Sequence, residues 1–503
     1  MSAALGRAVL GRLRGLPAPG PRGPGPRPAR RLGRPAAGER LPGGGRPLAA
    51  AAAAAGDAGA EGAAVLVRDF VHGALYDERA GYFVAKAGAV GELAEPLDFG
   101  SMVGRDGYMR KVREAYEAIG VSWLTPAAIF DPHYSHAVAR YFLEAHRSRV
   151  QGEGLKIYEV GGGTGAVARS ILDFVRQEDP EAYEAMQYRV IEISAALAER
   201  QLAKVREGGA EHLRVFDVWH GDASSPESWE SFGGASDETC FVFGLEVLDN
   251  MPHDLVRCTD RGEFEEATVA PGAGGEPAER WRPLQDPLVR ECLAAYDWYN
   301  EEQQRGPISA AEAEGGGLMG SMLDFIEGTG AGGLTQRLWL PTRSLEFFKC
   351  VHRMRPNHQL LLADFDALPD VRVDGINAPL VADTRGAAGR DYRTYLLPYG
   401  TADIFFPTNF DALCKLYDAC VPGAGGGGRG GAGAAAAGKA AQKGGGATHH
   451  ISTAEFMEVY ADMACTRTVG GYEPLLEDYQ NTRIFIAGTE APFVHGLVRV
   501  DGC

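Results

Sequence analysis

The chain has 503 residues, enough for two or three domains or one elaborated α/β domain, and its formal net charge is −17. It contains no run of 18 or more apolar residues, so the sequence gives no membrane-spanning helix. The first 50 residues carry a net +9 and the remainder −26, an acidic balance that argues against nucleic-acid binding. The eight cysteines form no CxxC pair and indicate neither a zinc cluster nor a disulfide framework.

The N-terminal segment has the composition of a targeting sequence. Its first 38 residues hold eight arginines and no acidic residue, and "ALGRAVLGRLRGL" would form a helix with apolar residues near one face. This pattern predicts a mitochondrial transit peptide. A chloroplast address has a similar composition, and a basic disordered tail is the other alternative. We expect residues 1–55 to lie outside the folded body.

Residues 56–150 are predicted to form a helical N-terminal region. The stretches "FVHGALYDERAGYF" and "SHAVARYFLEAH" are rich in aromatic residues and have helix-like spacing.

From residue 151 to the end, apolar runs and helix-like segments alternate. The runs that read as buried strands are 156–160, 188–193, 213–218, 240–248, 358–365 and 482–488. The helix-like segments are 166–177, 195–206, 285–304 and 343–354. Alternating strands and helices predict an α/β fold, with a parallel sheet covered by helices on both faces.

Three glycine-rich stretches interrupt this pattern. Residues 271–279 and 314–320 are predicted to be loops. Residues 422–450 form a low-complexity insertion that cannot bury a core, and we expect it to be disordered. His449 and His450 end this insertion, and we assign them no metal site.

A glycine turn follows the first strand in "KIYEVGGGTGAVARSILDFV". Glu159 stands near the strand end, and Gly161, Gly163 and Gly165 follow at alternate positions before a helix begins near Ala166. Ligands of open α/β sheets bind at the carboxyl ends of strands, where glycine lets the backbone approach them closely. The same residues also fit the dinucleotide pattern GxGxx(G/A), which leaves a nicotinamide cofactor as an alternative.

Acidic residues also follow the next two strands. Glu192 in "VIEIS" could accept hydrogen bonds from both hydroxyls of a ribose, and Asp222 in "HGDAS" could accept one from the amine of adenine. Each acid alone could instead cap a helix or lie in a loop. Together with the glycine turn, they are more typical of a site for S-adenosylmethionine.

The fourth strand runs into "GLEVLDNMPHDLV", which holds Glu246 and Asp249. A carboxylate in or beside an apolar run is costly unless something pairs with it. A guanidinium group would suit this pair, because its donors form a fork that matches carboxylates. The alternative is that Glu246 caps a helix and Asp249 forms a turn. His253, after a proline, is expected to be a structural turn residue.

The stretches "YEVGGGTG", "VIEISAALAERQ" and "GLEVLDNMPHDLV" together resemble the MidA-like S-adenosylmethionine-dependent methyltransferases. These include the protein arginine methyltransferases of the mitochondrial complex I assembly-factor class. "ALYDERAGYF", "RLWLPT" and "ADIFFPTNF" resemble the plant and algal members in particular. The resemblance runs from about residue 65 to 488, without the low-complexity insertion.

The resemblance implies a class I methyltransferase fold, a Rossmann-like doubly wound sheet of seven strands with an elaborated helical N-terminal region. It implies that Glu159, Gly161, Gly163, Gly165 and Glu192 bind S-adenosylmethionine. The family's acidic loop carries over to Glu246, Asp249 and Pro252, but Leu245 stands where the family has asparagine and Asn250 where it has alanine.

The activity that the resemblance implies is methylation of a protein arginine in the mitochondrial matrix, with a complex I subunit as the expected partner. An assembly chaperone that binds S-adenosylmethionine with little catalysis is the strongest alternative. Methylation of a small molecule is another.

Overall fold

The computed structural model describes residues 64–85, 91–119, 124–149, 153–259, 263–304, 337–383, 389–421 and 448–488. The predicted transit peptide, the predicted loop 314–320 and most of the low-complexity insertion lie outside these residues. None of the helices in the described part of the chain is long and apolar enough to cross a membrane.

The largest sheet has seven strands, in the order β14-β15-β10-β5-β2-β3-β4. Strands β10, β5, β2, β3 and β4 pair in parallel, while β15 is antiparallel to both of its neighbours. The strands are β2 (Lys156–Val160), β3 (Gln187–Glu192), β4 (Phe216–His220), β5 (Cys240–Leu245), β10 (His358–Phe365), β14 (His449–Ser452) and β15 (Thr482–Gly488).

Neighbouring residues of these strands point to opposite faces of the sheet, and both faces are apolar. In β2, Ile157 belongs to the core on one face and Tyr158 to the core on the other. In β5, Phe241 and Val242 divide in the same way. Continuous apolar runs such as "CFVFGL" therefore form the central strands β5 and β10, which are buried on both faces. The outer strand β4 has exposed positions.

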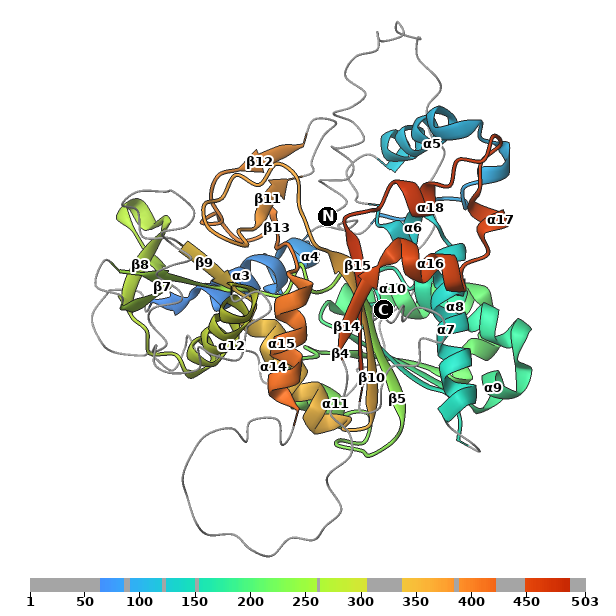
Figure 1. The fold of residues 1–503 in the computed structure, drawn as a ribbon, viewed down its shortest axis with the longest axis horizontal. Helices are drawn as coiled ribbons and strands as arrows, with labels where there is room; N and C mark the ends of the chain where they lie inside the picture. Colours follow the sequence, from blue (N-terminus) through green and yellow to red (C-terminus); the bar gives the residue numbers. More distant parts are fainter. Residues whose placement is uncertain are drawn as a thin grey trace, which may run out of the picture.

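Helices cover the two faces of this sheet (Figure 1). The first core includes residues of α7 (His133–Arg149), α8 (Ala166–Glu178) and α10 (Ala195–Gly208). The second includes residues of α12 (Pro287–Gln304), α14 (Thr342–Met354) and α15 (Phe410–Cys420). This arrangement confirms the mixed α/β class that the sequence predicts.

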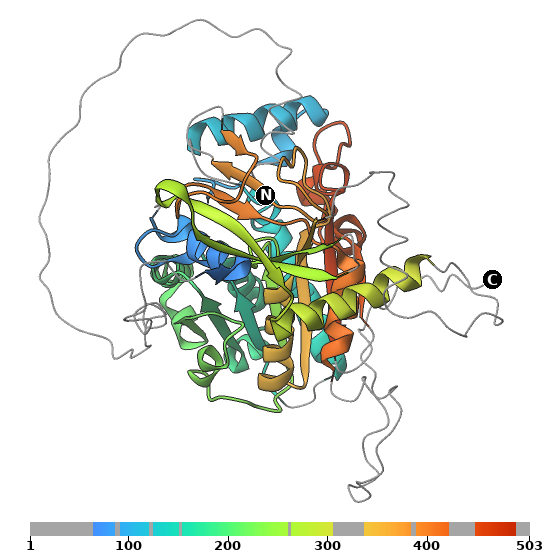
Figure 2. The same ribbon diagram turned by 90° about the vertical axis from the view of Figure 1, so that its left-hand side faces the viewer.

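Two smaller antiparallel sheets lie beside the seven-stranded sheet (Figures 1 and 2). One contains β1 (Val65–Leu66), β7 (Phe264–Pro271), β6 (Asp254–Cys258) and β9 (Arg337–Leu340), with β8 (Pro277–Pro283) paired to β7. The other contains β12 (Arg390–Tyr392), β11 (Leu380–Asp383) and β13 (Asp403–Phe405). A third core joins both sheets to α3 (Val67–Tyr76). The sequence analysis did not predict either sheet.

The remaining helical elements are short or flank the two helical layers. They are α4 (Tyr82–Ala85), η1 (Phe99–Ser101), α5 (Gly104–Ile119), α6 (Pro126–Ile129), α9 (Pro180–Ala185), η2 (Ala210–Arg214), α11 (Pro226–Glu230), η3 (Ala273–Gly275), α16 (Thr453–Tyr460), α17 (Met463–Thr466) and α18 (Pro474–Glu477).

Five local predictions were wrong in part. The run 240–248 is a strand only as far as Leu245. The run 213–218 begins in the 3-10 helix η2, and its strand starts only at Phe216. Residues 271–279, predicted to be a loop, close the hairpin of β7 and β8, and the second strand already begins at Pro277. The end of the expected disordered insertion forms β14, with His450 paired to Asp411. The large sheet is mixed rather than parallel because of β15.

Candidate active site

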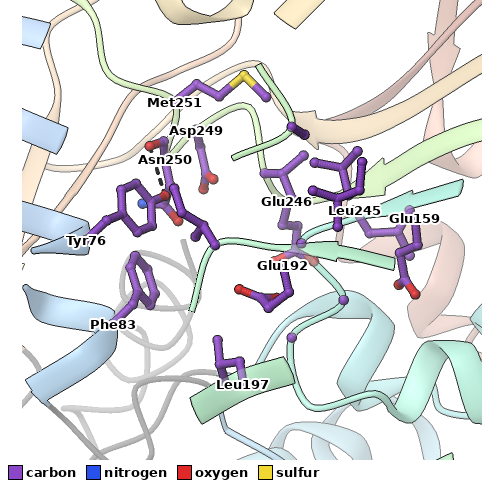
Figure 3. Close-up of a pocket in the computed structure, with 18 of the residues that line it drawn as sticks. Tyr76, Phe83, Glu159, Glu192, Leu197, Leu245, Glu246, Asp249, Asn250 and Met251 are labelled. Carbon is purple, nitrogen blue, oxygen red and sulfur yellow. Dashed lines mark hydrogen bonds between the residues drawn. The ribbon is translucent and has the colours of Figure 1, made fainter. Parts of the chain in front are cut away.

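A cavity of about 230 Å³ opens at the edge of the large sheet where β2, β3 and β5 end. Its lining comes from the glycine turn after β2, the ends of β3 and β5, the loop after β4, and parts of α3 and β13. In Figure 3, Tyr76 and Phe83 approach from one side, Glu159 lies on the opposite side, and Glu192 lies between them. The sequence-predicted Glu159, Gly161, Gly163, Glu192, Asp222, Glu246 and Asp249 all contribute to this lining.

The glycine turn has a backbone that other residues would strain. Gly161, Gly163 and Gly165 have φ angles of +67°, +53° and +85°, in the left-handed region that favours glycine. A Cβ on Gly161 would lie 2.7 Å from Cγ1 of Val247, and one on Gly165 would lie 2.7 Å from Cα of Gln201. Gly165, outside the cavity lining, is the N-cap of α8. The glycines therefore allow β2, α8, α10 and the loop after β5 to meet at close range.

Glu192 ends β3 and is held by two donors. Its Oε1 accepts from the backbone N–H of Ser194 at 2.9 Å, and its Oε2 accepts from Nε2 of Gln201 at 2.8 Å. The same Nε2 lies 3.1 Å from the carbonyl oxygen of Gly163. Gln201 thus joins the glycine turn to the acid, a role that the sequence analysis missed. It lies nine residues after Glu192 on α10, and only the end of the quoted stretch "VIEISAALAERQ" hinted at it.

The carboxyl groups on this side of the cavity are less acidic than usual. Burial raises the pKa of Glu192 to about 7, although the N–H donors of Ser194 and Gln201 favour its ionised form. Burial also raises the pKa of Glu159 to about 8; the Tyr188 hydroxyl, at 2.9 Å, opposes this effect and the charge of Glu192 adds to it. The affinity for a ligand that hydrogen-bonds to ionised Glu192 should therefore depend on pH near neutrality.

Asp222 follows β4 in a tight turn. Its Oδ1 accepts from the backbone N–H of Ser224 at 2.8 Å and from the Ser224 hydroxyl at 2.6 Å. The turn brings the loop after β4 into the cavity lining. These two hydrogen bonds support the turn. They involve only Oδ1 of Asp222, so Oδ2 takes no part in them.

Glu246 and Asp249 lie in the loop after β5. Glu246 has a φ of +56°, which is rare for a residue with a side chain, and its backbone N–H donates to the carbonyl oxygen of Ala363 at 2.8 Å. Asp249 is 2% exposed, and its Oδ1 has no hydrogen-bond partner among the described residues. Burial raises the pKa of both carboxyl groups, and the charges of Asp249 and Asp364 raise that of Glu246 further. The two carboxyl groups thus lie at one cavity, costly to ionise without a cation.

Asp364, near the end of β10, holds the loop after β5 in place. Its Oδ2 accepts from the backbone N–H groups of Leu248 at 2.9 Å and Asp249 at 3.1 Å. The sequence analysis missed it, although an acid inside the apolar run "HQLLLADF" is the same signal that singled out Glu246.

Asn250, Tyr76 and Asp403 form the far wall of the cavity, and the sequence analysis assigned no role to any of them. The hydroxyl of Tyr76 donates to the carbonyl oxygen of Asn250 at 3.1 Å (Figure 3). Nδ2 of Asn250 donates to Oδ1 of Asp403 at 3.1 Å. These residues come from three distant parts of the chain, so no local pattern could have grouped them.

His253 lies outside the cavity lining. Its ring stacks on Phe406 with centroids 3.9 Å apart, and its Nδ1 donates to the carbonyl oxygen of Met251 at 2.8 Å. Burial lowers its pKa to about 3, so the ring is neutral at physiological pH. These contacts are those of a structural residue. No group of three potential metal ligands occurs within the described ranges.

Known proteins similar to this chain share its fold over most of its length. A crystal structure of a Burkholderia thailandensis protein bound to S-adenosyl-homocysteine has a TM-score of 0.51 and 16% identity, covering 87% of this chain and 90% of that one. A native crystal structure from the same organism has a TM-score of 0.50, also at 16% identity, with 87% and 89% coverage. At this identity the likeness concerns the fold.

One curated relative is the mitochondrial "Protein arginine methyltransferase NDUFAF7 homolog" of Schizosaccharomyces pombe. It is 26% identical over 255 residues, which are 49% of this chain and 51% of the relative. The match thus spans about half of the relative's length.

A family model described as "putative S-adenosyl-L-methionine-dependent methyltransferase" matches residues 137–421. These residues make up more than half of the chain and include the glycine turn, Glu192, Asp222 and the loop after β5. The cofactor of this family is S-adenosylmethionine, as the resemblance implied, and the nicotinamide alternative has no support. The chain belongs to this family of S-adenosylmethionine-dependent methyltransferases.

Proposed function

We propose that this protein methylates the guanidinium group of an arginine side chain in a mitochondrial protein, with a subunit of respiratory complex I as the expected acceptor. The carboxyl groups of the loop after β5 support a cationic acceptor, because a buried acid is stabilised by a positive partner. The name of the Schizosaccharomyces pombe relative supports arginine, a protein acceptor and the mitochondrion.

The residues around the glycine turn fit S-adenosylmethionine. Gly161, Gly162 and Gly163 present bare backbone to the cavity. The two bonds that Glu192 accepts leave acceptor positions on both oxygens, enough for two ribose hydroxyls. Asp222 likewise keeps an oxygen for the amine of adenine. Glu159 would support the strand end that precedes the turn, through its hydrogen bond with Tyr188 of β3.

A Gln201→Met variant should bind S-adenosylmethionine roughly tenfold more weakly, because methionine keeps the length of the side chain and loses two hydrogen bonds. The glycine turn and Glu192 then both lose the hydrogen bond that Nε2 of Gln201 donates to them. Calorimetric titration of both proteins measures the change. Gln187→Met, at an exposed position of β3, is the matched control. Equal affinity of Gln201→Met and the parent chain for S-adenosylmethionine would show that these hydrogen bonds do not contribute to cofactor binding.

The affinity for S-adenosylmethionine should rise with pH and level off above about 7, the pKa of Glu192. Only the ionised carboxylate accepts hydrogen bonds from two hydroxyls at once, so the affinity should fall by roughly tenfold for each pH unit below that value. Titrations from pH 5.5 to pH 8.5 would measure this slope. A Glu192→Gln variant should bind weakly with a flatter profile. An unchanged slope in that variant would assign the titration to another group, such as Glu159.

When bound, S-adenosylmethionine supplies a methyl group on a positively charged sulfur, which leaves as a neutral thioether. The chain must hold the acceptor nitrogen in line with the bond between carbon and sulfur. Glu246 and Asp249 would bind N–H donors of the guanidinium group. Oδ1 of Asp249, which has no hydrogen-bond partner among the described residues, would take the proton that the nitrogen loses on methylation.

The observation that carries this proposal is the buried Oδ1 of Asp249 at the cavity, which has no hydrogen-bond partner in the described part of the chain. The test is incubation of the full chain with S-adenosylmethionine carrying a labelled methyl group and an extract of mitochondria. Mass spectrometry of the labelled proteins should find methylated arginine. Binding of S-adenosylmethionine with no labelled product would favour the assembly chaperone. Label found only in small molecules would favour methylation of a small molecule as the function.

A further inference from the structure

Asp403 brings a third carboxylate to the cavity from outside the methyltransferase sheet. It begins β13 of the three-stranded sheet, is 3% exposed, and lines the same cavity as Glu246 and Asp249. Burial raises its pKa to about 6, and the charge of Asp249 adds to this effect. Two buried carboxylates repel each other when both are ionised, so this pair does not stabilise the fold itself.

Three hydrogen bonds fix β13 and the residue that follows it against the loop after β5. Nδ2 of Asn250 donates to Oδ1 of Asp403 at 3.1 Å and to the carbonyl oxygen of Ile404 at 3.2 Å. The backbone N–H of Phe406 donates to the carbonyl oxygen of Asp249 at 2.8 Å. The side chain of Asp403 is therefore held at a set place beside Asp249, and the bond from Asn250 uses one of its oxygens.

Tyr76 closes the third side of this group. Its hydroxyl donates to the carbonyl oxygen of Asn250 at 3.1 Å, so α3 also meets the loop after β5 (Figure 3). In the same view the carboxylate of Asp249 points toward the space beside Tyr76 and Asn250. Its Oδ1 is buried and has no hydrogen-bond partner among the described residues, which indicates that a ligand atom belongs there.

We infer that Asp403 is a specificity-determining residue, which binds one edge of a planar guanidinium acceptor while Asp249 and Glu246 bind another. The inference rests on the proposed function and deepens it. Carboxylates that reach the cavity from two different sheets match a cation with donors along several edges. An arginine side chain presents five N–H donors in a rigid plane, whereas the ammonium of lysine is a compact point charge. The arrangement therefore selects arginine over lysine.

The test compares two probes, N-acetyl-arginine methylamide and N-acetyl-lysine methylamide, titrated by calorimetry into the full chain saturated with S-adenosyl-homocysteine. The parent chain should bind the arginine probe, and Asp403→Asn should weaken that binding by roughly tenfold, the effect of one charge-assisted hydrogen bond. Asp403→Glu should restore part of the loss. Asp391→Asn, in β12 of the same small sheet and outside the cavity lining, is the matched control.

Asp403→Asn replaces a buried acid with a neutral side chain of the same shape, so it should fold. Asn250→Ala provides an independent variant, which removes the amide that holds Asp403 and should reduce the preference for arginine over lysine. The affinity of each variant for S-adenosylmethionine should stay unchanged, because neither residue contacts the glycine turn or Glu192 through a hydrogen bond that the structure shows.

The outcomes separate the two proposals. If the parent chain binds the arginine probe and Asp403→Asn binds it equally well, Asp403 does not select the acceptor, while the proposed function stands. If the parent chain binds S-adenosyl-homocysteine but prefers the lysine probe or binds neither probe, both proposals fail. Loss of the arginine probe with retained cofactor affinity in Asp403→Asn supports both.

Discussion

A Gly161→Val variant is expected to bind S-adenosylmethionine at least roughly 100-fold more weakly than the parent chain, since backbone strain and a steric clash each cost on the order of 1–3 kcal/mol. Valine is β-branched and does not adopt a φ of +67° without strain. Its Cβ would lie 2.7 Å from Cγ1 of Val247, a residue that itself lines the cavity. Either the turn or the loop after β5 would have to move.

Calorimetric titration with S-adenosylmethionine measures this loss, and thermal unfolding shows that the variant is folded. Gly104→Val is the matched control, because Gly104 also has a positive φ, +58°, but no atom lies within 4 Å of its added Cβ. The control carries the same kind of backbone strain at a residue outside the cavity lining. Parent-like affinity in a folded Gly161→Val protein would show that the turn does not form the cofactor site.

An Asp249→Asn variant should transfer methyl groups roughly 100-fold more slowly, a loss typical of removing one preorganised electrostatic group from an active site. The amide keeps the shape of the side chain and can still accept, but it cannot balance a positive acceptor or take a proton. The affinity for S-adenosylmethionine should stay within about twofold of the parent, because Asp249 makes no hydrogen bond to the glycine turn or Glu192 in this structure.

The measurement is the initial rate of labelled methyl incorporation into mitochondrial protein, beside a cofactor titration of the same sample. Asp217→Asn, at an exposed position of β4, controls for the loss of one carboxylate. Glu246→Gln should resemble Asp249→Asn. Full activity of both cavity variants would remove these acids from the proposed site and favour an acceptor held elsewhere.

The meeting of the proposed cofactor residues at one cavity could be predicted from the sequence, because these residues follow neighbouring strands of one sheet. Glu159, the glycines and Glu192 lie at the ends of strands that read as apolar runs, and parallel strands bring their carboxyl ends to one edge. Gln201 escaped because a glutamine on a helix is ordinary, and only the fold shows that it reaches both Gly163 and Glu192.

The other side of the cavity could not be predicted in this way. Tyr76, Asn250 and Asp403 meet only through tertiary packing, and Asp403 begins a strand of three residues that no periodicity identifies. The strands of the hairpin β7–β8 were missed because the turn between them, at 271–279, is rich in glycine and proline, whose propensities favour a loop.

The contrast between these two sides has a consequence for how such a protein can change. The half that we propose for the cofactor lies within one contiguous stretch, about residues 159 to 222, whereas the opposite half of the cavity depends on segments near residues 76, 250 and 403. On the proposed function, substitutions in β13 or α3 would therefore alter which molecule is modified while the methyl donor stays the same. Relatives that exchange only these segments would inherit one chemistry and diverge in its target, and grafting them is a direct route to redesigning the target.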